Sequence, residues 1–222
     1  MAIIPAFPTA LPELNDLLLG TKIKEGGNTT KNFRIGEVLA LLGNTGLTPA
    51  SVNYGLFSQT QDSQAITNTT TVRNLLRNGV GSTIVAADTM LVGDSFNIKS
   101  RGVLSCLNLT VLTIVVSTNA GIVLASSGPI TMRGANSKSW CLDTDITVRQ
   151  TGIAGVASVA TSGTFTYNKD GDNISEMVNF TLVNNATFNT TIPNNIIVTA
   201  QWTTASASNS IYSSIYNFTK TY

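Results

Sequence analysis

Hydrophobic and polar residues alternate along most of the chain after residue 53, and this period of two residues predicts β-strands. The clearest run spans residues 140–149, where the apolar side chains fall on even positions and the charged ones on odd positions. Trp140 and Trp202 lie on apolar faces and are expected to be core anchors. Similar alternation marks residues 95–104, 107–111, 178–182 and 196–202. In the last run the same rule predicts one shared face for Tyr212, Tyr216, Phe218 and Tyr222.

Turn-forming residues separate the alternating runs. Glycine, asparagine, aspartate and proline favour tight turns. They cluster at residues 78–79, 92–94, 119–121, 127–129, 169–172 and 193–195. This spacing predicts about eight to ten short strands, and no helical period follows Gly43. The expected fold class is all-β: an antiparallel β-sandwich of the jelly-roll type.

The first fifty residues follow a different pattern. Pro5, Pro8 and Pro12 hold residues 1–14 in an extended arm, because proline fixes φ and restricts the residue before it. The arm has apolar side chains but no core of its own. We therefore expect it to pack on the body of the protein or on a neighbouring subunit.

A small hairpin module is expected after the arm. Residues 16–23 and 31–35 each predict a short strand, and the glycine-rich segment 25–28 predicts the turn between them. Residues 36–42 predict a short helix. Such a module is too small to be stable alone. The expected domains are an attachment module over residues 1–50 and a β-sandwich over residues 51–222.

Composition limits the chemistry that the chain offers. Charged residues make up 11% of the chain, the formal net charge is +1, and asparagine, serine and threonine account for 74 of the 222 residues. The absence of histidine excludes histidine-based nucleophilic catalysis and histidine metal ligands. A net charge near zero argues against nucleic-acid binding, which needs clustered cations. We expect no catalytic residues, no cofactor and no metal ion, and a protein that is not an enzyme.

Two acidic groupings come nearest to a chemical site. Asp170, Asp172 and Glu176 lie close in sequence, but the glycine and glutamate that a calcium loop requires are missing, so a hairpin tip is favoured. Asp143 and Asp145 lie two residues apart and share one predicted strand face. Their neighbours suit a solvated face with a local ion pair better than a pair of catalytic carboxylates.

The cysteines and the N-terminus bear on the compartment. Cys106 and Cys141 are interpreted as two reduced thiols, with a single bridge as the alternative if their strands are neighbours. The N-terminus lacks a basic start followed by an unbroken apolar run. We therefore expect no secretory signal, no membrane span and synthesis in the cytoplasm.

The C-terminal tyrosines form the candidate recognition surface. Tyr212, Tyr216 and Tyr222 are amphipathic side chains, which suit a subunit interface or a sugar-binding face. The favoured interpretation is burial inside the sandwich or in an oligomer. Binding of a host-surface glycan is the alternative.

Several segments resemble known virion proteins. Residues 11–23, LPELNDLLLGTKI, and residues 26–39, GGNTTKNFRIGEVL, resemble the N-terminal module of tailed-phage fibre and appendage proteins. Other segments resemble domains of phage and large-virus virion proteins: residues 56–63, 92–96, 152–158, 183–192 and 202–211. Together these segments span most of the chain, and they offer no catalytic residues to carry over.

The resemblance implies a structural component of a bacteriophage particle, namely a homotrimeric head fibre, tail fibre or capsid decoration protein located in the virion. In this interpretation the N-terminal segment binds capsid or other virion proteins, and the sandwich projects outward from residue 54. The alternative is a receptor- or glycan-binding module used in host attachment. The side chains expected to make the attachment are Ile3, Ile4, Phe7, Leu11, Leu14 and Leu17.

Overall fold

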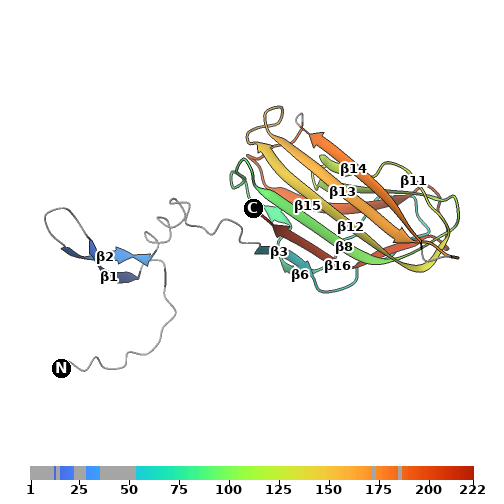
Figure 1. The fold of residues 1–222 in the computed structure, drawn as a ribbon, viewed down its shortest axis with the longest axis horizontal. Coiled ribbons are helices and arrows are strands. Elements are labelled where there is room, and N and C mark those ends of the chain that lie inside the picture. The colour runs from blue at the N-terminus through green and yellow to red at the C-terminus, as the bar shows by residue number, and fades with distance from the viewer. Residues whose placement is uncertain (1–12, 14–15, 23–28, 36–53, 172–173, 185–186) are drawn as a thin grey trace, which may run out of the picture. The chain divides into compact units, whose positions relative to one another are not determined.

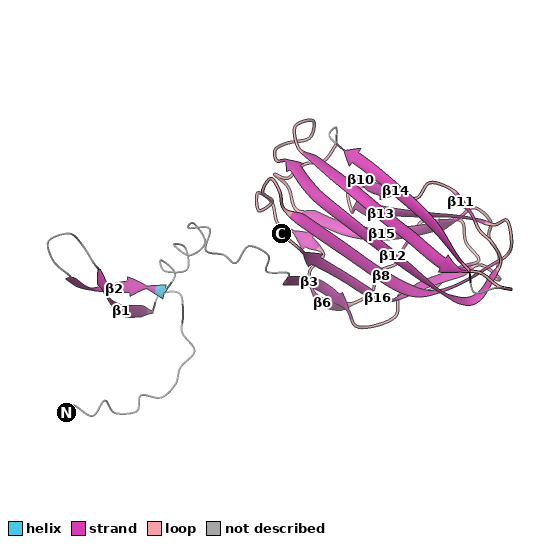
Figure 2. Cartoon of the chain, in the orientation of Figure 1, coloured by secondary structure: helices cyan, strands magenta, loops and turns pink. Residues whose placement is uncertain are grey.

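The computed structural model describes residues 13, 16–22, 29–35, 54–171, 174–184 and 187–222. The chain separates into two compact units, Met1–Val52 and Asn53–Tyr222 (Figure 1). Each unit is described by itself. Within the described residues every strand pairing is antiparallel, and the regular elements are strands apart from one helical residue, Ile35, after β2 (Figure 2).

The first unit contains the predicted hairpin. Strand β1, Leu17–Lys22, pairs antiparallel with β2, Thr29–Arg34, in a register that sets Leu17 opposite Arg34. The amide of Ile35 donates to the carbonyl of Asp16 at 2.9 Å, which closes the open end of the pair. The arm over residues 1–12, the turn over residues 25–28 and the helix expected over residues 36–42 lie outside the described residues.

The second unit is a sandwich of an eight-stranded and a six-stranded antiparallel sheet (Figures 1 and 2). The larger sheet has the order β14-β13-β12-β8-β16-β3-β6, with β4 beside β16. Its strands are β3 (Tyr54–Gln59), β4 (Ile66–Thr67), β6 (Gly79–Gly81), β8 (Ser95–Cys106), β12 (Ala135–Gln150), β13 (Ser158–Asn168), β14 (Ser175–Asn184) and β16 (Ser210–Lys220). The all-β, antiparallel class expected from the alternation is confirmed.

The smaller sheet has the order β10-β9-β15-β5, with β11 beside β9 and β7 beside β15. Its strands are β5 (Arg73–Asn74), β7 (Ile84–Val85), β9 (Val111–Thr118), β10 (Val123–Ser126), β11 (Ile130–Thr131) and β15 (Asn194–Trp202). Several of these strands have only two residues, too short for any sequence period to reveal them.

The core lies between the two sheets and is built by the alternation. On β12 the even positions from Trp140 to Val148 are buried and the charged odd positions are exposed, and on β15 every second residue from Ile196 to Trp202 is buried. Both tryptophans are buried, as expected, and both indole N–H groups have acceptors. Trp202 donates to the carbonyl of Ile66 at 3.1 Å, which links the two sheets.

A register shift interrupts β16 between Ser213 and Ile215. Before the shift the odd position Ile211 is buried, and after it the even positions Tyr216 and Phe218 are buried. One extra residue in a strand moves all later side chains to the opposite face. The prediction of a single face for Tyr212, Tyr216, Phe218 and Tyr222 is therefore wrong, because a strict period of two cannot account for a bulge.

Gly102 on β8 makes the bulge possible. It lies opposite Ser213 on one side and Trp140 on the other. A Cβ atom at residue 102 would collide with the carbonyl oxygen of Tyr212 and crowd the Cα of Ser213. That carbonyl instead accepts a hydrogen bond from the indole N–H of Trp140 at 3.1 Å. The glycine and the tryptophan together provide the space and the donor that the bulge requires.

A buried polar network satisfies the backbone of Ser213 on β16. Its partners are Gln59 at the end of β3 and Ser63 in the segment between β3 and β4. The amide of Ser213 donates to Oγ of Ser63 at 2.9 Å, and its carbonyl accepts from the amide of Ser63 at 2.8 Å and from Nε2 of Gln59 at 3.0 Å. Oγ of Ser213 donates to the carbonyl of Leu75 at 2.6 Å. Buried backbone groups need such partners, so these contacts hold the segment over residues 59–77, which includes β4 and β5, against β16 at Gln59, Ser63 and Leu75.

We expect Gly102→Ala to destabilise the sandwich by about 2–3 kcal/mol, because the added methyl group overpacks a site bounded by backbone. For a domain of this size the melting temperature should fall by roughly 5–10 °C. Gly55→Ala on β3 is the matched control, since a Cβ there has no neighbour within 4 Å. Equal melting temperatures for the two variants, measured by circular dichroism, would contradict this account of the bulge.

Candidate functional site

The structure separates the three candidate tyrosines. Tyr216 is fully buried, its ring lies edge-on to Phe57 with centroids 5.9 Å apart, and burial raises the pKa of its hydroxyl. Tyr212 is half-buried on the opposite side of the bulge, and Tyr222 is exposed beyond the end of β16. The three side chains therefore do not form one surface, and Tyr216 belongs to the core.

The residues expected to make the particle attachment fall almost wholly outside the described part of the chain. Ile3, Ile4, Phe7, Leu11 and Leu14 lie there, and nothing in the structure bears on them. Leu17, at the start of β1, is described, and 60% of its surface is exposed. A leucine this exposed on a two-stranded hairpin is available to a partner.

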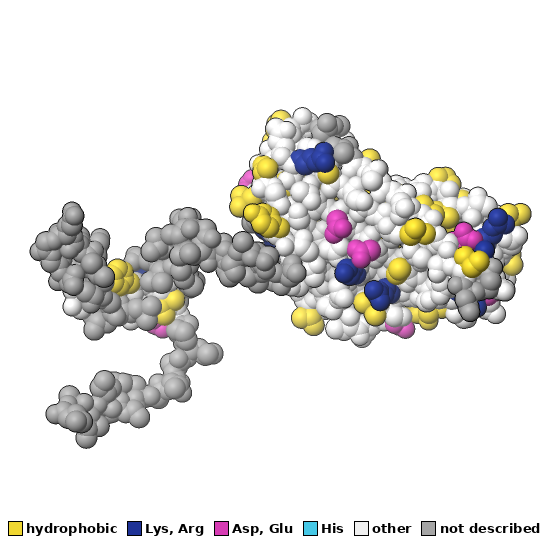
Figure 3. Space-filling model, viewed as in Figure 1, with side chains coloured by type: hydrophobic (Ala, Val, Ile, Leu, Met, Phe, Trp, Pro, Cys, Tyr) yellow, Lys and Arg dark blue, Asp and Glu magenta, His cyan; other side chains and the backbone are white. Residues whose placement is uncertain are grey.

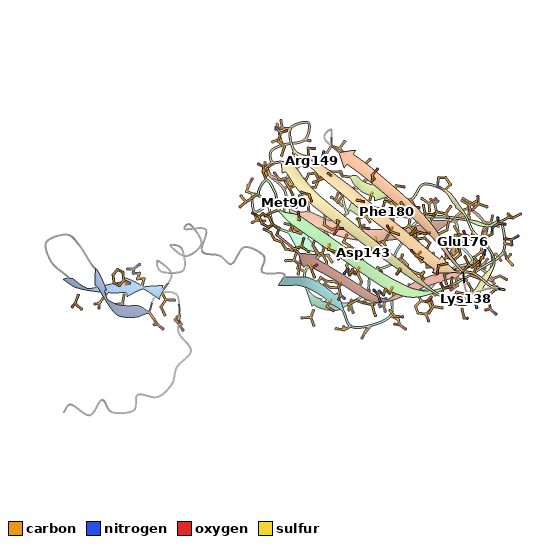
Figure 4. All side chains as sticks on the ribbon, in the orientation of Figure 1. Met90, Lys138, Asp143, Arg149, Glu176 and Phe180 are labelled. Carbon is orange, nitrogen blue, oxygen red and sulfur yellow. The ribbon has the colours of Figure 1, made fainter. Side chains whose placement is uncertain are left out.

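Asp143 and Asp145 project from the outer face of β12 and are bridged by one amide. Nδ2 of Asn97 donates to Oδ1 of each aspartate at 2.8 Å. Lys99 lies 3.8 Å from Asp143, so the expected local ion pair is present. Figure 4 shows Asp143 near the middle of β12, between Lys138 and Arg149 toward its two ends. The two carboxylates share a structural donor on an open sheet face.

The acidic hairpin between β13 and β14 is held by lysines. Asp170 lies 3.4 Å from Lys138, and Glu176 lies 3.1 Å from Lys169. Asp172 is outside the described residues. Asn168 pairs with Ser175 where β13 ends and β14 begins, so the segment between them is the tip of a hairpin, as predicted. In the part of the chain that the structure describes, no three acidic or cysteine side chains gather as metal ligands.

The outer face of the larger sheet is mainly neutral. Figure 3 shows a surface made mostly of uncharged polar atoms, with a group of acidic and basic side chains near its middle and a few more toward its edges and ends. Hydroxyl and amide side chains bond to one another across neighbouring strands. Examples are Thr164 with Asn179 at 2.9 Å and Ser95 with Thr147 at 3.0 Å. This face is a polar, hydrogen-bonding surface of low charge.

One end of the sandwich exposes apolar side chains from separate loops. The chain enters β3 at this end, where Tyr54 lies opposite Lys220. The loop before β8 contacts the end of β12 here, because the amide of Gly93 donates to the carbonyl of Val148 at 2.8 Å. Hydrophobic side chains are visible at this end in Figure 3. The exposed apolar residues of these loops and of the C-terminus are Leu91, Val92, Ile153, Val156 and Tyr222.

A cavity of about 510 Å³ lies against the segment over residues 59–77, which hydrogen bonds tie to Ser213. Two of its residues, Arg73 and Arg77, are cations, and no acidic side chain is among its described lining residues. The lining is Gln64, Ala65, Ile66, Thr67, Thr69, Arg73, Asn74, Leu76 and Arg77. Most of these side chains are polar and exposed.

The backbone around this cavity is fixed at several points. The amide of Leu75 donates to the carbonyl of Val198 at 2.9 Å, and the amide of Arg77 donates to Oε1 of Gln59 at 2.9 Å. The amide of Leu76 donates to Oδ1 of Asn74 at 2.9 Å. Sequence reasoning missed this site because its residues carry no motif. The available signal was weak: Arg73 and Arg77 are the only cations between residues 35 and 98.

The comparisons with known proteins are negative: no family model, no curated protein and no solved structure matches the chain. Within the described residues, no helix has the length and apolar character needed to cross a membrane.

The two cysteines are free thiols on opposite faces of the larger sheet. Although β8 and β12 are neighbours, Cys106 lies opposite Ala135 and Cys141 lies opposite Arg101, so the two sulfurs are not aligned. Cys106 points inward, its Sγ donates to the carbonyl of Arg133 at 3.2 Å, and burial raises the pKa of its thiol to about 11. Cys141 is half-exposed. The interpretation as two unbridged thiols is confirmed.

We expect iodoacetamide at pH 8 to modify Cys141 at least tenfold faster than Cys106 in the folded protein, because only the thiolate reacts and Cys106 is buried in its protonated form. Peptide mass spectrometry measures both rates. In urea the two cysteines should react alike. The raised pKa of Cys106 also makes the stability depend on pH. As the pH rises from about 9 toward 11, the unfolded chain loses the thiol proton that the folded chain keeps, so the free energy of unfolding falls. Similar rates in the folded protein would refute the inward placement.

Proposed function

We propose that the protein is a structural component of a viral particle: an oligomeric head-fibre, tail-fibre or decoration protein of a bacteriophage, made in the host cytoplasm and anchored to capsid or other virion proteins by its N-terminal segment. The observation that carries the proposal is the separate hairpin unit. A two-stranded hairpin is at best marginally stable alone in water. Among the described residues no third strand joins β1 and β2. We infer that packing on a partner protein stabilises this hairpin.

The distribution of charge supports this arrangement. The first fifty residues contain 8 of the 25 charged residues, so the other 172 residues contain 17. A body with so few ions can stand beside identical copies without strong like-charge repulsion. Its surface remains hydrated through hydroxyl and amide groups. The low charge of the sandwich therefore suits a component that is repeated many times on one particle.

The apolar end of the sandwich supports self-association. Exposed apolar residues that gather on a surface commonly mark a protein–protein interface. Leu91, Val92 and Ile153 belong to loops at the end where the chain enters the sandwich. Contact between copies at this end would place their N-terminal segments together. We propose a homotrimer on this basis and on the resemblance to fibre proteins.

A second candidate function is attachment to a host-surface glycan. The sequence indicated the C-terminal tyrosines as the binding face, whereas the structure favours the cavity lined by Arg73 and Arg77. The buried Tyr216 cannot contact a sugar without unfolding β16. The cavity that contains Arg73 and Arg77 has the volume of a small-molecule site, and its polar side chains can hydrogen-bond to sugar hydroxyls. We therefore propose the cavity, rather than the tyrosines, as the glycan-binding site.

We expect deletion of residues 1–52 to leave a folded, oligomeric sandwich that no longer enters particles, because the core of the second unit is formed entirely by residues after 53. Circular dichroism and analytical ultracentrifugation check the fold and the oligomer. Immunoblotting of purified particles checks incorporation.

Substitutions at single exposed apolar residues provide the matched controls for the deletion. Leu17→Lys on the hairpin should reduce incorporation, whereas Ile215→Lys on the sandwich should not, since both side chains are exposed and only the first lies in the attachment unit. Normal incorporation of the truncated chain would refute the anchoring proposal.

A further inference from the structure

We propose that the cavity lined by Arg73 and Arg77 binds an acidic saccharide, that is, a sugar that carries a carboxylate or a sulfate group. The cavity has a volume of about 510 Å³, which is in the range of small-molecule sites. The proposal rests on the glycan-binding function proposed for this cavity and names its substrate class, and it does not depend on the structural role in a particle.

The charge of the cavity favours an anion. Arg73 and Arg77 are both exposed, and neither guanidinium has an acceptor among the described residues. The described lining has no carboxylate that could neutralise them. Guanidinium groups bind carboxylate and sulfate oxygens through paired, charge-assisted hydrogen bonds. Each of the two arginines can therefore bind an acidic group of a ligand in the cavity.

The remaining lining favours a sugar around that acidic group. Gln64 and Thr67 present amide and hydroxyl groups, and Asn74 uses only its Oδ1 internally, which leaves its amide N–H groups for a ligand. Such groups match the hydroxyls of a saccharide as donors and acceptors. Ala65 and Leu76 add a small apolar surface against which the C–H face of a sugar ring can pack.

The cavity is held in shape before any ligand binds. The backbone of Leu75 is bonded on one side to Val198 and on the other to Oγ of Ser213, and Gln59 holds the amide of Arg77. These bonds lie within and beside the lining segment. A preformed site avoids the cost of ordering a loop on binding. The bulge network is thus the support of the binding site.

A nucleic acid is a poorer ligand for the same residues. Binding to a phosphate backbone requires many cations along a groove, and single strands also need aromatic side chains on which bases can stack. The described lining has two cations and no aromatic residue. An isolated acidic sugar needs only the two arginines and the polar groups beside them. Several copies in one oligomer would then multiply a weak affinity.

The test is a glycan array probed with the full-length protein, containing sialic-acid-terminated, glucuronic-acid-terminated and sulfated glycans, each beside its neutral counterpart. We expect binding to acidic members and not to their neutral counterparts. Binding to the carboxylated members identifies the acid as a carboxylate, and binding to the sulfated members identifies a sulfate. Either result supports the proposal. Absence of binding to every acidic member, or equal binding to acidic and neutral members, would overturn it.

Three variants then locate the site. By titration calorimetry with the best array glycan, Arg73→Gln and Arg77→Gln should each weaken binding about tenfold, the loss expected for one hydrogen bond to a charged group. Arg149→Gln, at an exposed arginine on β12 outside the cavity, is the matched control and should change the affinity less than about twofold. Unchanged melting temperatures show that the fold is intact. Equal losses in all three variants, or none in the first two, would refute the assignment.

The outcome is independent of the proposed structural role. A protein that enters particles and binds no acidic glycan refutes the binding site alone. A protein that binds the glycan through Arg73 and Arg77 and is absent from particles refutes the structural role alone.

Discussion

The register shift in β16 is the constraint on which much of the sandwich depends. One extra residue near Ser213 turns the side chains of Tyr216 and Phe218 into the core. It also leaves backbone groups at Tyr212 and Ser213 that need hydrogen-bond partners outside the regular strand pairing. The absence of a side chain at Gly102 leaves room for the shifted backbone. The indole of Trp140 and the side chains of Gln59 and Ser63 satisfy the polar groups that the shift exposes. The bulge would leave unpaired buried polar groups if it stood alone, and these hydrogen bonds make it part of a specific, well-packed core.

The same network extends from the core to the surface. Ser213 holds Leu75, and Gln59 holds Arg77, so the segment between them has a fixed backbone although its side chains are exposed. Binding residues in loops commonly depend on this kind of rigid support. Ser213 and Gln59 therefore link the packing inside the sandwich to the surface segment that lines the cavity. The outer face of the larger sheet, in contrast, carries hydroxyl and amide side chains among a few charges of both signs.

Regular alternation made most of the body predictable from the sequence. The buried faces of β12 and β15, both tryptophans and the N-terminal hairpin were expected and are present. The face of β16 was predicted wrongly, because a bulge changes the period at a point that no local residue marks. The cavity was missed because its lining residues form no motif: Arg73 lies on a two-residue strand and Arg77 lies in the loop after it.

The central functional claim is that the first unit contacts the particle and the second does not. Chemical cross-linking of lysines on intact virions, followed by mass spectrometry, tests it directly, because each unit carries its own lysines. Lys22 and Lys31 belong to the hairpin, and Lys99 and Lys138 are exposed on the sandwich. Our account predicts that Lys22 and Lys31 cross-link to other virion proteins, while Lys99 and Lys138 cross-link only to copies of this chain. Cross-links from the sandwich lysines to other virion proteins, with none from the hairpin, would contradict it.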